Sequence, residues 1–146
     1  MAIHFQTHEV NLILKHKRLL SKFIQQQVLS YLPEVRKITL QYIFCSDDYL
    51  LQINQNYLQH NTYTDIITFD LSDTATELQG EIYISIDRVA ENATQYGVSL
   101  NTELHRVIFH GMLHLCGFKD KSTKDKTMMT QAENDCLEAY FNDFTA

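Results

Sequence analysis

Apolar and polar positions recur with two different periods along the chain, and the changes of period predict the order of its elements. Residues 37–44 alternate apolar and polar side chains, which is the period of a strand with one better-buried face. Before that strand, apolar residues recur near helical spacing from Leu20 to Tyr31, and Pro33 stops this helix because proline cannot continue it. Residues 3–5 are expected to form a short first strand.

The middle of the chain is predicted to form a helix followed by two neighbouring strands. Ser46 can cap the helix, and the two aspartates that follow it stand favourably in the first helical turn. The β-branched residues leading up to Asp70 and the apolar segment 80–85 are typical of strands. The polar residues 71–79 between them are expected to form a mobile loop.

Three helices are predicted in the last part of the chain. The first begins after Ser85 and ends near Gly97, and the second begins at Ser99 or Asn101. The third opens at Ser122 with a variant of the capping box that has aspartate in place of glutamate. Its inner stripe is interpreted as core and consists of Met129, Ala132, Cys136 and Tyr140.

The order of these elements predicts an α+β fold in which a mixed β-sheet of about four strands is covered by about five helices. No linker, internal repeat or low-complexity segment divides the sequence. We therefore expect residues 1–146 to form a single domain.

Composition favours a globular protein of the cytoplasm. The 146 residues are 45% apolar and 11% aromatic, which suffices for one domain with a real core. No apolar run is long enough to span a membrane, and the N-terminus lacks the charged and apolar regions of a secretory signal. The three cysteines show no C-x-x-C spacing, so we expect reduced, mostly buried thiols.

The charge of the chain argues against RNA binding by overall attraction, since the formal net charge is −6. Residues 47–87 contain eight acidic residues and no Lys or Arg. Two basic clusters qualify this picture. The first cluster consists of Lys15, Lys17, Arg18 and Lys22. The second, which matters more because it follows the candidate site, consists of Lys119, Lys121, Lys124 and Lys126.

The clearest chemical signal is a pair of histidines four residues apart, His110 and His114, on an apolar helix. Residues at this spacing share one face of a helix with β-carbons about 5 to 6 Å apart, which suits two imidazoles that bind one metal ion. Gly117 is the usual residue for a left-handed helix cap, and such a turn can bring Asp120 back towards the imidazoles. The alternative is two core histidines hydrogen-bonded to backbone.

Three sequence blocks, in this order, resemble the YbeY family of bacterial rRNA maturation endoribonucleases. The family patterns are approximately T-D-V-L-S-F, G-D-I-x-I-S and H-G-x-L-H-L-x-G-Y-D-H. The matching residues are Thr64-Asp-Ile-Ile-Thr-Phe69, Gly80-Glu-Ile-Tyr-Ile-Ser85 and His110-Gly-Met-Leu-His-Leu-Cys-Gly-Phe-Lys-Asp120. In the third block, Phe118 replaces tyrosine, Lys119 replaces aspartate and Asp120 replaces the third histidine.

The resemblance implies a metal-dependent hydrolase domain. Its expected activity is zinc-dependent single-strand endoribonuclease cleavage in ribosomal RNA maturation, especially at the 3′ end of the small-subunit rRNA, and in ribosome quality control. It also implies ribosomal RNA and the ribosome or ribosome-associated proteins as partners. No membrane partner and no small-molecule organic cofactor is expected.

A site with two histidines and one further protein ligand leaves coordination positions open, as catalytic metal sites do. The residues alone do not choose between phosphodiester and peptide bonds. A metallopeptidase of the H-E-x-x-H type is disfavoured because Gly111 stands where its glutamate would be. A non-catalytic, metal-stabilised protein of the ribosome is the second alternative.

We predict Asp120 as the third metal ligand; a solvent-facing aspartate near the next helix cap is the alternative. Two histidines and a carboxylate suit zinc, and also iron, manganese or nickel, so one Zn²⁺ or another divalent transition metal is expected. His110, His114 and Asp120 would therefore be catalytic through the metal.

RNA contacts are assigned to Lys119, Lys121 and Arg106. The family usually has an arginine where this chain has Leu58, and leucine cannot clamp a phosphate. Replacements for that arginine are sought among His60, Arg88, Arg106 and the lysines at 119, 121, 124 and 126. By the resemblance of neighbouring strands, Asp70 and Glu81 are possible general bases, although solvated or capping roles remain open for both.

Overall fold

The computed structural model describes residues 1–60 and 62–144. Within those residues the chain forms four strands, five α-helices and a closing π-helical turn, as an α+β fold. In chain order they are β1 (Ala2–Thr7), α1 (Lys17–Tyr31), β2 (Lys37–Cys45), α2 (Asp47–Leu58), β3 (Ile66–Asp70), β4 (Glu77–Ser85), α3 (Ile86–Tyr96), α4 (Leu100–Leu115), α5 (Thr123–Glu138) and η1 (Ala139–Phe144).

The four strands form one mixed sheet in the order β1-β2-β4-β3. The strands β1, β2 and β4 run parallel, with Ile3 opposite Leu40 and Leu40 opposite Gly80. Only β3 runs antiparallel, and it pairs with β4 at the edge of the sheet. Parallel neighbours need a long crossover, and α1 supplies it between β1 and β2. The expected mixed sheet is confirmed.

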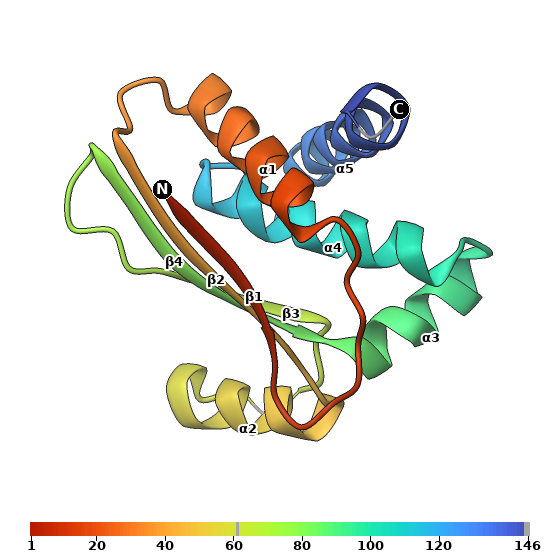
Figure 1. Cartoon of the computed structure of the whole chain (residues 1–146). Helices are drawn as coiled ribbons and strands as arrows, with labels where there is room; N and C mark the ends of the chain where they lie inside the picture. Colours follow the sequence, from red (N-terminus) through yellow and green to blue (C-terminus); the bar gives the residue numbers. More distant parts are fainter. Residues whose placement is uncertain (61, 145–146) are drawn as a thin grey trace.

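The helices cover the two faces of the sheet unequally (Figure 1). Helices α1, α4 and α5 lie on one face, over a large cluster of buried side chains, and α2 alone lies on the other. The hydroxyl of buried Tyr42 on β2 donates a 2.9 Å hydrogen bond to the carbonyl of Ile108 on α4. This contact joins the centre of the sheet to the helix that carries both histidines of the candidate site.

Serine caps start four of the helices. In each cap the serine Oγ accepts a hydrogen bond from a backbone N–H three residues later, which satisfies a donor that the helix itself leaves unpaired. The pairs are Ser46 with Tyr49, Ser85 with Arg88, Ser99 with Thr102 and Ser122 with Asp125. The caps predicted at Ser46 and Ser122 are confirmed, and Ser99 rather than Asn101 starts α4.

The prediction of a mobile loop over residues 71–79 is wrong at its C-terminal end, because β4 begins at Glu77. The hairpin continues beyond β3: Leu71 N donates to the carbonyl of Gln79 at 2.7 Å, and Gln79 N donates to Ser72 Oγ at 3.0 Å. Leu78 and Gly80 are buried between more exposed polar neighbours. That alternation of period two was hidden because a glycine occupies one of the two buried positions.

None of the helices in the described part of the chain combines the length and apolar character needed to cross a membrane. The three cysteines are free thiols, with Cys45 and Cys136 buried and Cys116 partly buried. Burial raises the pKa of each thiol to about 12. The expectation of reduced, mostly buried cysteines is confirmed.

Candidate metal centre

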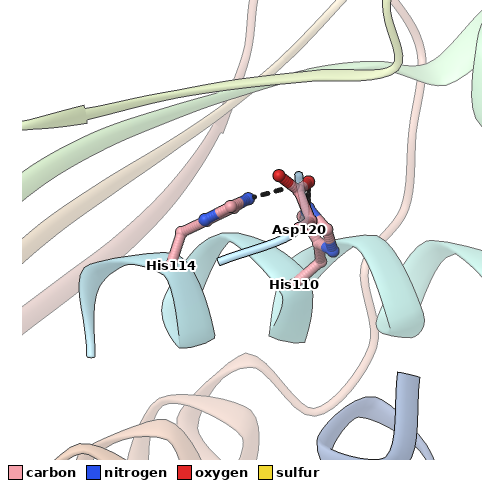
Figure 2. A group of neighbouring side chains, drawn as sticks. All are labelled: His110, His114 and Asp120. Carbon is pink, nitrogen blue, oxygen red and sulfur yellow. Dashed lines mark hydrogen bonds and ion pairs between the residues drawn. The ribbon is translucent and has the colours of Figure 1, made fainter. Parts of the chain in front are cut away.

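Helix α4 presents His110 and His114 on one face, as their spacing predicts. Their ring centroids lie 4.6 Å apart with the rings nearly perpendicular. Figure 2 shows the two rings and Asp120 converging from the helix and from the segment that follows it. The Nε2 atoms of His110 and His114 lie 3.3 and 3.2 Å from the same oxygen, Oδ2 of Asp120.

Close packing against the sheet fixes the position of α4. Gly111, between the two histidines, is buried against β3 and β4, and a Cβ atom there would lie 2.8 Å from Ile82 Cγ2 and 3.1 Å from Ile66 Cδ1. Only glycine allows the helix to approach the strands this closely. The histidines therefore project from a helix held by the core.

A Schellman turn ends α4 and returns the chain to the histidines. Gly117 has a φ of +103°, which favours glycine. The N–H of Phe118 donates to the carbonyl of Leu113, and the N–H of Gly117 donates to that of His114, both at 3.0 Å. These two bonds define the motif. The left-handed cap expected at Gly117 is confirmed, and it brings Asp120 to the imidazoles.

The second nitrogen of each ring has its own acceptor. His114 Nδ1 lies 2.9 Å from the carbonyl oxygen of Phe118, and His110 Nδ1 lies 2.5 Å from Oε2 of Glu133 on α5. With its hydrogen on Nδ1, as these partners assign it, a neutral imidazole presents a bare lone pair on Nε2. Two lone pairs and a carboxylate oxygen then face one another, and such a group needs a cation.

A divalent metal ion fits this donor set. The ligand atoms of His110, His114 and Asp120 all lie within 4.8 Å of one another, and no other such trio occurs in the described residues. Imidazole nitrogen and carboxylate oxygen are common ligands of zinc and of other divalent transition metals. Three protein donors leave positions open to solvent or substrate. The alternative of two core histidines bonded only to backbone does not describe this geometry.

Nearby carboxylates set the charge preference of the site. Burial lowers the pKa of His110, but the hydrogen bond and charge of Glu133, followed by the charges of Asp120 and Asp65, outweigh it and leave that pKa above its ordinary value. Burial raises the pKa of Asp65, although His110 partly opposes the change. The carboxylates thus favour positive charge at the His110 imidazole, and the same negative surroundings favour a bound cation.

The three candidate ligands lie in an open cleft of about 970 Å³ between β3 and the helices α3, α4 and α5. Alternate residues of β3 form one wall, and Tyr96 and Val98 form another. The carboxylates that line the cleft are Asp65, Asp70, Glu103, Asp120 and Glu133. Among the described residues Arg106 is its one Lys or Arg side chain, so the cleft is anionic unless a metal ion is bound.

A family model described as Endoribonuclease YbeY matches residues 2–141. The chain belongs to the YbeY family. A relative from Bacteroides thetaiotaomicron, named Endoribonuclease YbeY, is 44% identical over 137 residues, which are 94% of this chain and 98% of that protein. A relative of the same name from Cytophaga hutchinsonii is 54% identical over 100 residues, covering 68% and 70% of the two chains.

A solved structure shares the fold at lower identity. The solution structure of a Thermotoga maritima protein aligns with a TM-score of 0.60 and 23% identity, covering 98% of this chain and 91% of that one. The YbeY assignment made from three sequence blocks is therefore confirmed over almost the whole chain, including the N-terminal third, where the sequence blocks gave only a general resemblance.

The basic residues considered for phosphate contact have different surroundings. Arg106 lines the cleft, but its guanidinium already binds Glu133 and Asn134. Lys119 and Lys121 are exposed on either side of Asp120. Leu58 and His60 are exposed near the end of α2, outside the cleft lining. Arg88 is bound to Asp47 at 2.8 Å.

The two candidate general bases lie on opposite faces of the sheet. Asp70 lines the cleft at the end of β3. Glu81 lies in a different hollow, with Tyr49 and Tyr83, and its Oε1 accepts a 3.3 Å hydrogen bond from Tyr83 Oη. Alternate residues of a strand face opposite sides, and Glu81 follows Gly80, which packs against Leu115 of α4. The structure therefore argues against Glu81 as a general base.

Three carboxylates that line the cleft, Asp65, Glu103 and Glu133, were given no role in the site from the sequence. Glu133 is only 7% exposed and belongs to the inner stripe of α5, between Ala132 and Cys136. A glutamate at a core position of a helix is unusual, and that position was the available signal. Asp65 lies within the T-D block of the YbeY resemblance, but it was not proposed for a role there.

Proposed function

We propose that this protein is a metal-dependent single-strand endoribonuclease that acts in ribosomal RNA maturation, at the 3′ end of small-subunit rRNA, and in ribosome quality control. The observation that carries the proposal is the convergence of His110, His114 and Asp120 in an open cleft of a YbeY-family chain. Relatives over most of the chain bear the name endoribonuclease.

His110 and His114 would hold the ion through Nε2, and Asp120 through its carboxylate. When bound, a divalent ion acidifies water and polarises a phosphoryl oxygen, which are the two requirements of phosphodiester hydrolysis. The Phe118 carbonyl orients His114 by accepting from its Nδ1. Asp65, whose pKa is raised by burial, lies in the same cleft, where it can hold or release a proton.

Lys119 and Lys121 are proposed to contact the RNA backbone, because they are exposed and flank a candidate ligand. Arg106 is less suited to this role than the sequence indicated, since its guanidinium is already hydrogen-bonded. A net charge of −6 and an anionic cleft give little general attraction for free RNA. We therefore propose that the ribosome or a ribosome-associated protein in the cytoplasm presents the substrate.

The test joins metal analysis with cleavage assays. Metal-free protein is reloaded with Zn²⁺, Mn²⁺, Fe²⁺ or Ni²⁺ and given single-stranded RNA, duplex RNA, single-stranded DNA, isolated ribosomes and a peptide substrate. We expect cleavage only of single-stranded RNA or ribosomes and only with metal. Metal binding without cleavage of any RNA would contradict the proposed endoribonuclease activity and favour a non-catalytic, metal-stabilised protein of the ribosome. Peptide cleavage would favour a metallopeptidase.

A further inference from the structure

Glu133 on α5 connects two side chains of α4. Its Oε2 lies 2.5 Å from Nδ1 of His110, and its Oε1 accepts a 2.9 Å hydrogen bond from Nη1 of Arg106. We propose that Glu133 is a positioning residue that fixes His110 as a metal ligand, and that Arg106 holds Glu133 in place. The proposal deepens the proposed function and rests on its metal site.

The arrangement of Arg106 fits a support for Glu133. Its Nη2 donates a 2.6 Å hydrogen bond to Oδ1 of Asn134, so the guanidinium binds two consecutive residues of α5. The Glu133 side chain is only 10% exposed, and because its Oε1 accepts from Arg106, Oε2 is the oxygen left for another partner. That oxygen faces the imidazole rather than solvent. A guanidinium engaged in this way orients a carboxylate and has little freedom to reach an RNA phosphate.

The two candidate histidine ligands differ in the partner at Nδ1. His114 donates to a neutral backbone carbonyl, that of Phe118, whereas His110 faces the carboxylate of Glu133. A carboxylate partner fixes the tautomer of a ligating imidazole and makes its other nitrogen a stronger donor than a carbonyl partner does. Of the two histidines, His110 is therefore the stronger electron-pair donor toward a metal ion, and its contact with Glu133 is the cause.

A purely structural ion pair would not require this geometry. Burying a charged pair costs desolvation that apolar residues of the same volume avoid, so such a pair is weak evidence for stability. The carboxylate also makes its shortest contact with the imidazole, not with the arginine. The geometry is that of a chain of contacts ending at the candidate metal site.

The experiment measures Zn²⁺ affinity by competition with a chromophoric chelator in wild type, Glu133→Gln and Glu103→Gln. Glu103 is the matched control, because it is buried to a similar degree, 4% against 7% exposed, and lines the same cleft. Since burial raises the pKa of Glu103, the comparison is made at pH 8. Loss of an outer-shell partner typically weakens metal affinity about 10- to 100-fold. We expect that loss for Glu133→Gln and a clearly smaller change for Glu103→Gln.

Arg106→Gln separates positioning from simple electrostatics by the sign of its effect. Removing a positive charge near a cation should tighten Zn²⁺ binding if charge alone matters. If Arg106 positions Glu133, Arg106→Gln weakens Zn²⁺ binding instead. The double variant Arg106→Gln, Glu133→Gln should then bind Zn²⁺ no more weakly than Glu133→Gln alone.

Two further measurements make the outcomes decisive. Circular dichroism and thermal unfolding establish that each variant is folded, and imidazole ¹⁵N shifts of the Zn²⁺-loaded protein report whether His110 keeps its hydrogen on Nδ1. Wild type that binds no Zn²⁺ would overturn the metal site itself. Wild type that binds Zn²⁺ while Glu133→Gln matches Glu103→Gln, or tighter binding in Arg106→Gln, would overturn only the positioning role.

Discussion

The two faces of the sheet differ in what covers them and in what they carry. The face under α1, α4 and α5 holds a continuous core that includes Phe23, Phe109 and Tyr140, and the candidate metal centre borders it. The opposite face has one helix, α2, over a small cluster of Cys45, Leu50, Ile53 and Ile67. Both faces of the sheet are covered by buried apolar side chains, but the candidate metal ligands lie on only one of them.

The larger core holds the candidate metal site in place. His110 and His114 project from a helix that is buried along most of its length, whereas α2 has a single buried stripe. Substitutions between α4 and the sheet should therefore change metal affinity, whereas substitutions beneath α2 should leave it unchanged.

The largest effect is expected for His110→Ala and His114→Ala. Each variant should lose bound metal, and RNA cleavage should fall to the level of metal-free protein. Loss of an outer-shell partner typically lowers metal affinity about 10- to 100-fold, and loss of a ligand should lower it further. The fold should be largely retained. Metal content, cleavage rate and circular dichroism are the measurements, and His4→Ala, at an exposed position of β1, is the control. Wild-type metal content in both variants would refute the site.

Leu50→Ala tests the opposite face. Leu50 is 1% exposed in the small cluster, so its truncation should cost about 2–5 kcal/mol of unfolding free energy. Zn²⁺ affinity of the folded variant should equal that of wild type. Urea unfolding and chelator competition measure the two quantities, and a weakened affinity would show that the faces are coupled.

Gly111→Ala tests the contact between α4 and the sheet. The new methyl group would lie 2.8 Å from Ile82 Cγ2, and overpacking of this kind costs about 1–3 kcal/mol. Alanine regains about 1 kcal/mol of helix propensity, so the net loss of unfolding free energy is expected to be about 0–2 kcal/mol, with weaker Zn²⁺ binding. Adding Ile82→Ala makes room for the methyl group, so the double variant should be more stable than the sum of the two changes. Additive losses would contradict the close contact.

Asp120→Asn should weaken metal affinity about 10-fold or more if the carboxylate is a ligand, which corresponds to about 1.4 kcal/mol. Asp120→His should retain zinc, because a third imidazole is also a common zinc ligand. It should also shift the pH dependence of cleavage to lower pH, since a neutral ligand leaves the site more positive and acidifies water more strongly. Metal titrations and pH–rate profiles measure both. Unchanged affinity in Asp120→Asn would remove Asp120 from the ligand set.

The smallest effect concerns His105, a third histidine on α4 that lies among Phe109, Tyr140 and Phe141. Burial lowers its pKa, although a hydrogen bond to the Asn101 carbonyl partly opposes this. As pH falls below about 6.5, the unfolded chain takes up this proton more readily than the native chain, so stability is lost. His105→Phe should reduce the loss measured between pH 7.5 and pH 5.5 by denaturant unfolding. An identical loss in both proteins would show that His105 does not titrate in this range.

Much of the fold followed from the sequence because its signals are local. Serine caps, the glycine at 117 and the apolar periods of the helices all act within a few residues. The start of β4 was missed because Gly80 replaces a large apolar residue at a buried position, and spacing cannot reveal that the missing volume is supplied by Leu115.

The site was accessible from sequence only where its residues are close in the chain. His110, His114 and Asp120 lie within one short segment, and the structure brings them together, while their role as metal ligands stays a prediction. Glu133 reaches His110 from another helix, so its contact depends on the packing of α5 against α4. The sequence block containing Glu81 suggested a general base, but the alternation of β4 directs Glu81 to the other face of the sheet.

The Schellman turn at Gly117 has a consequence for when a metal ion could be acquired. Because the turn returns Asp120 to the helix that carries the histidines, all three candidate ligands come from residues 110–120. An ion bound there closes a short loop whose ends the turn has already joined, so it removes little further chain entropy. The domain should therefore fold before it is loaded, survive removal of the ion by a chelator, and exchange one divalent metal for another without unfolding.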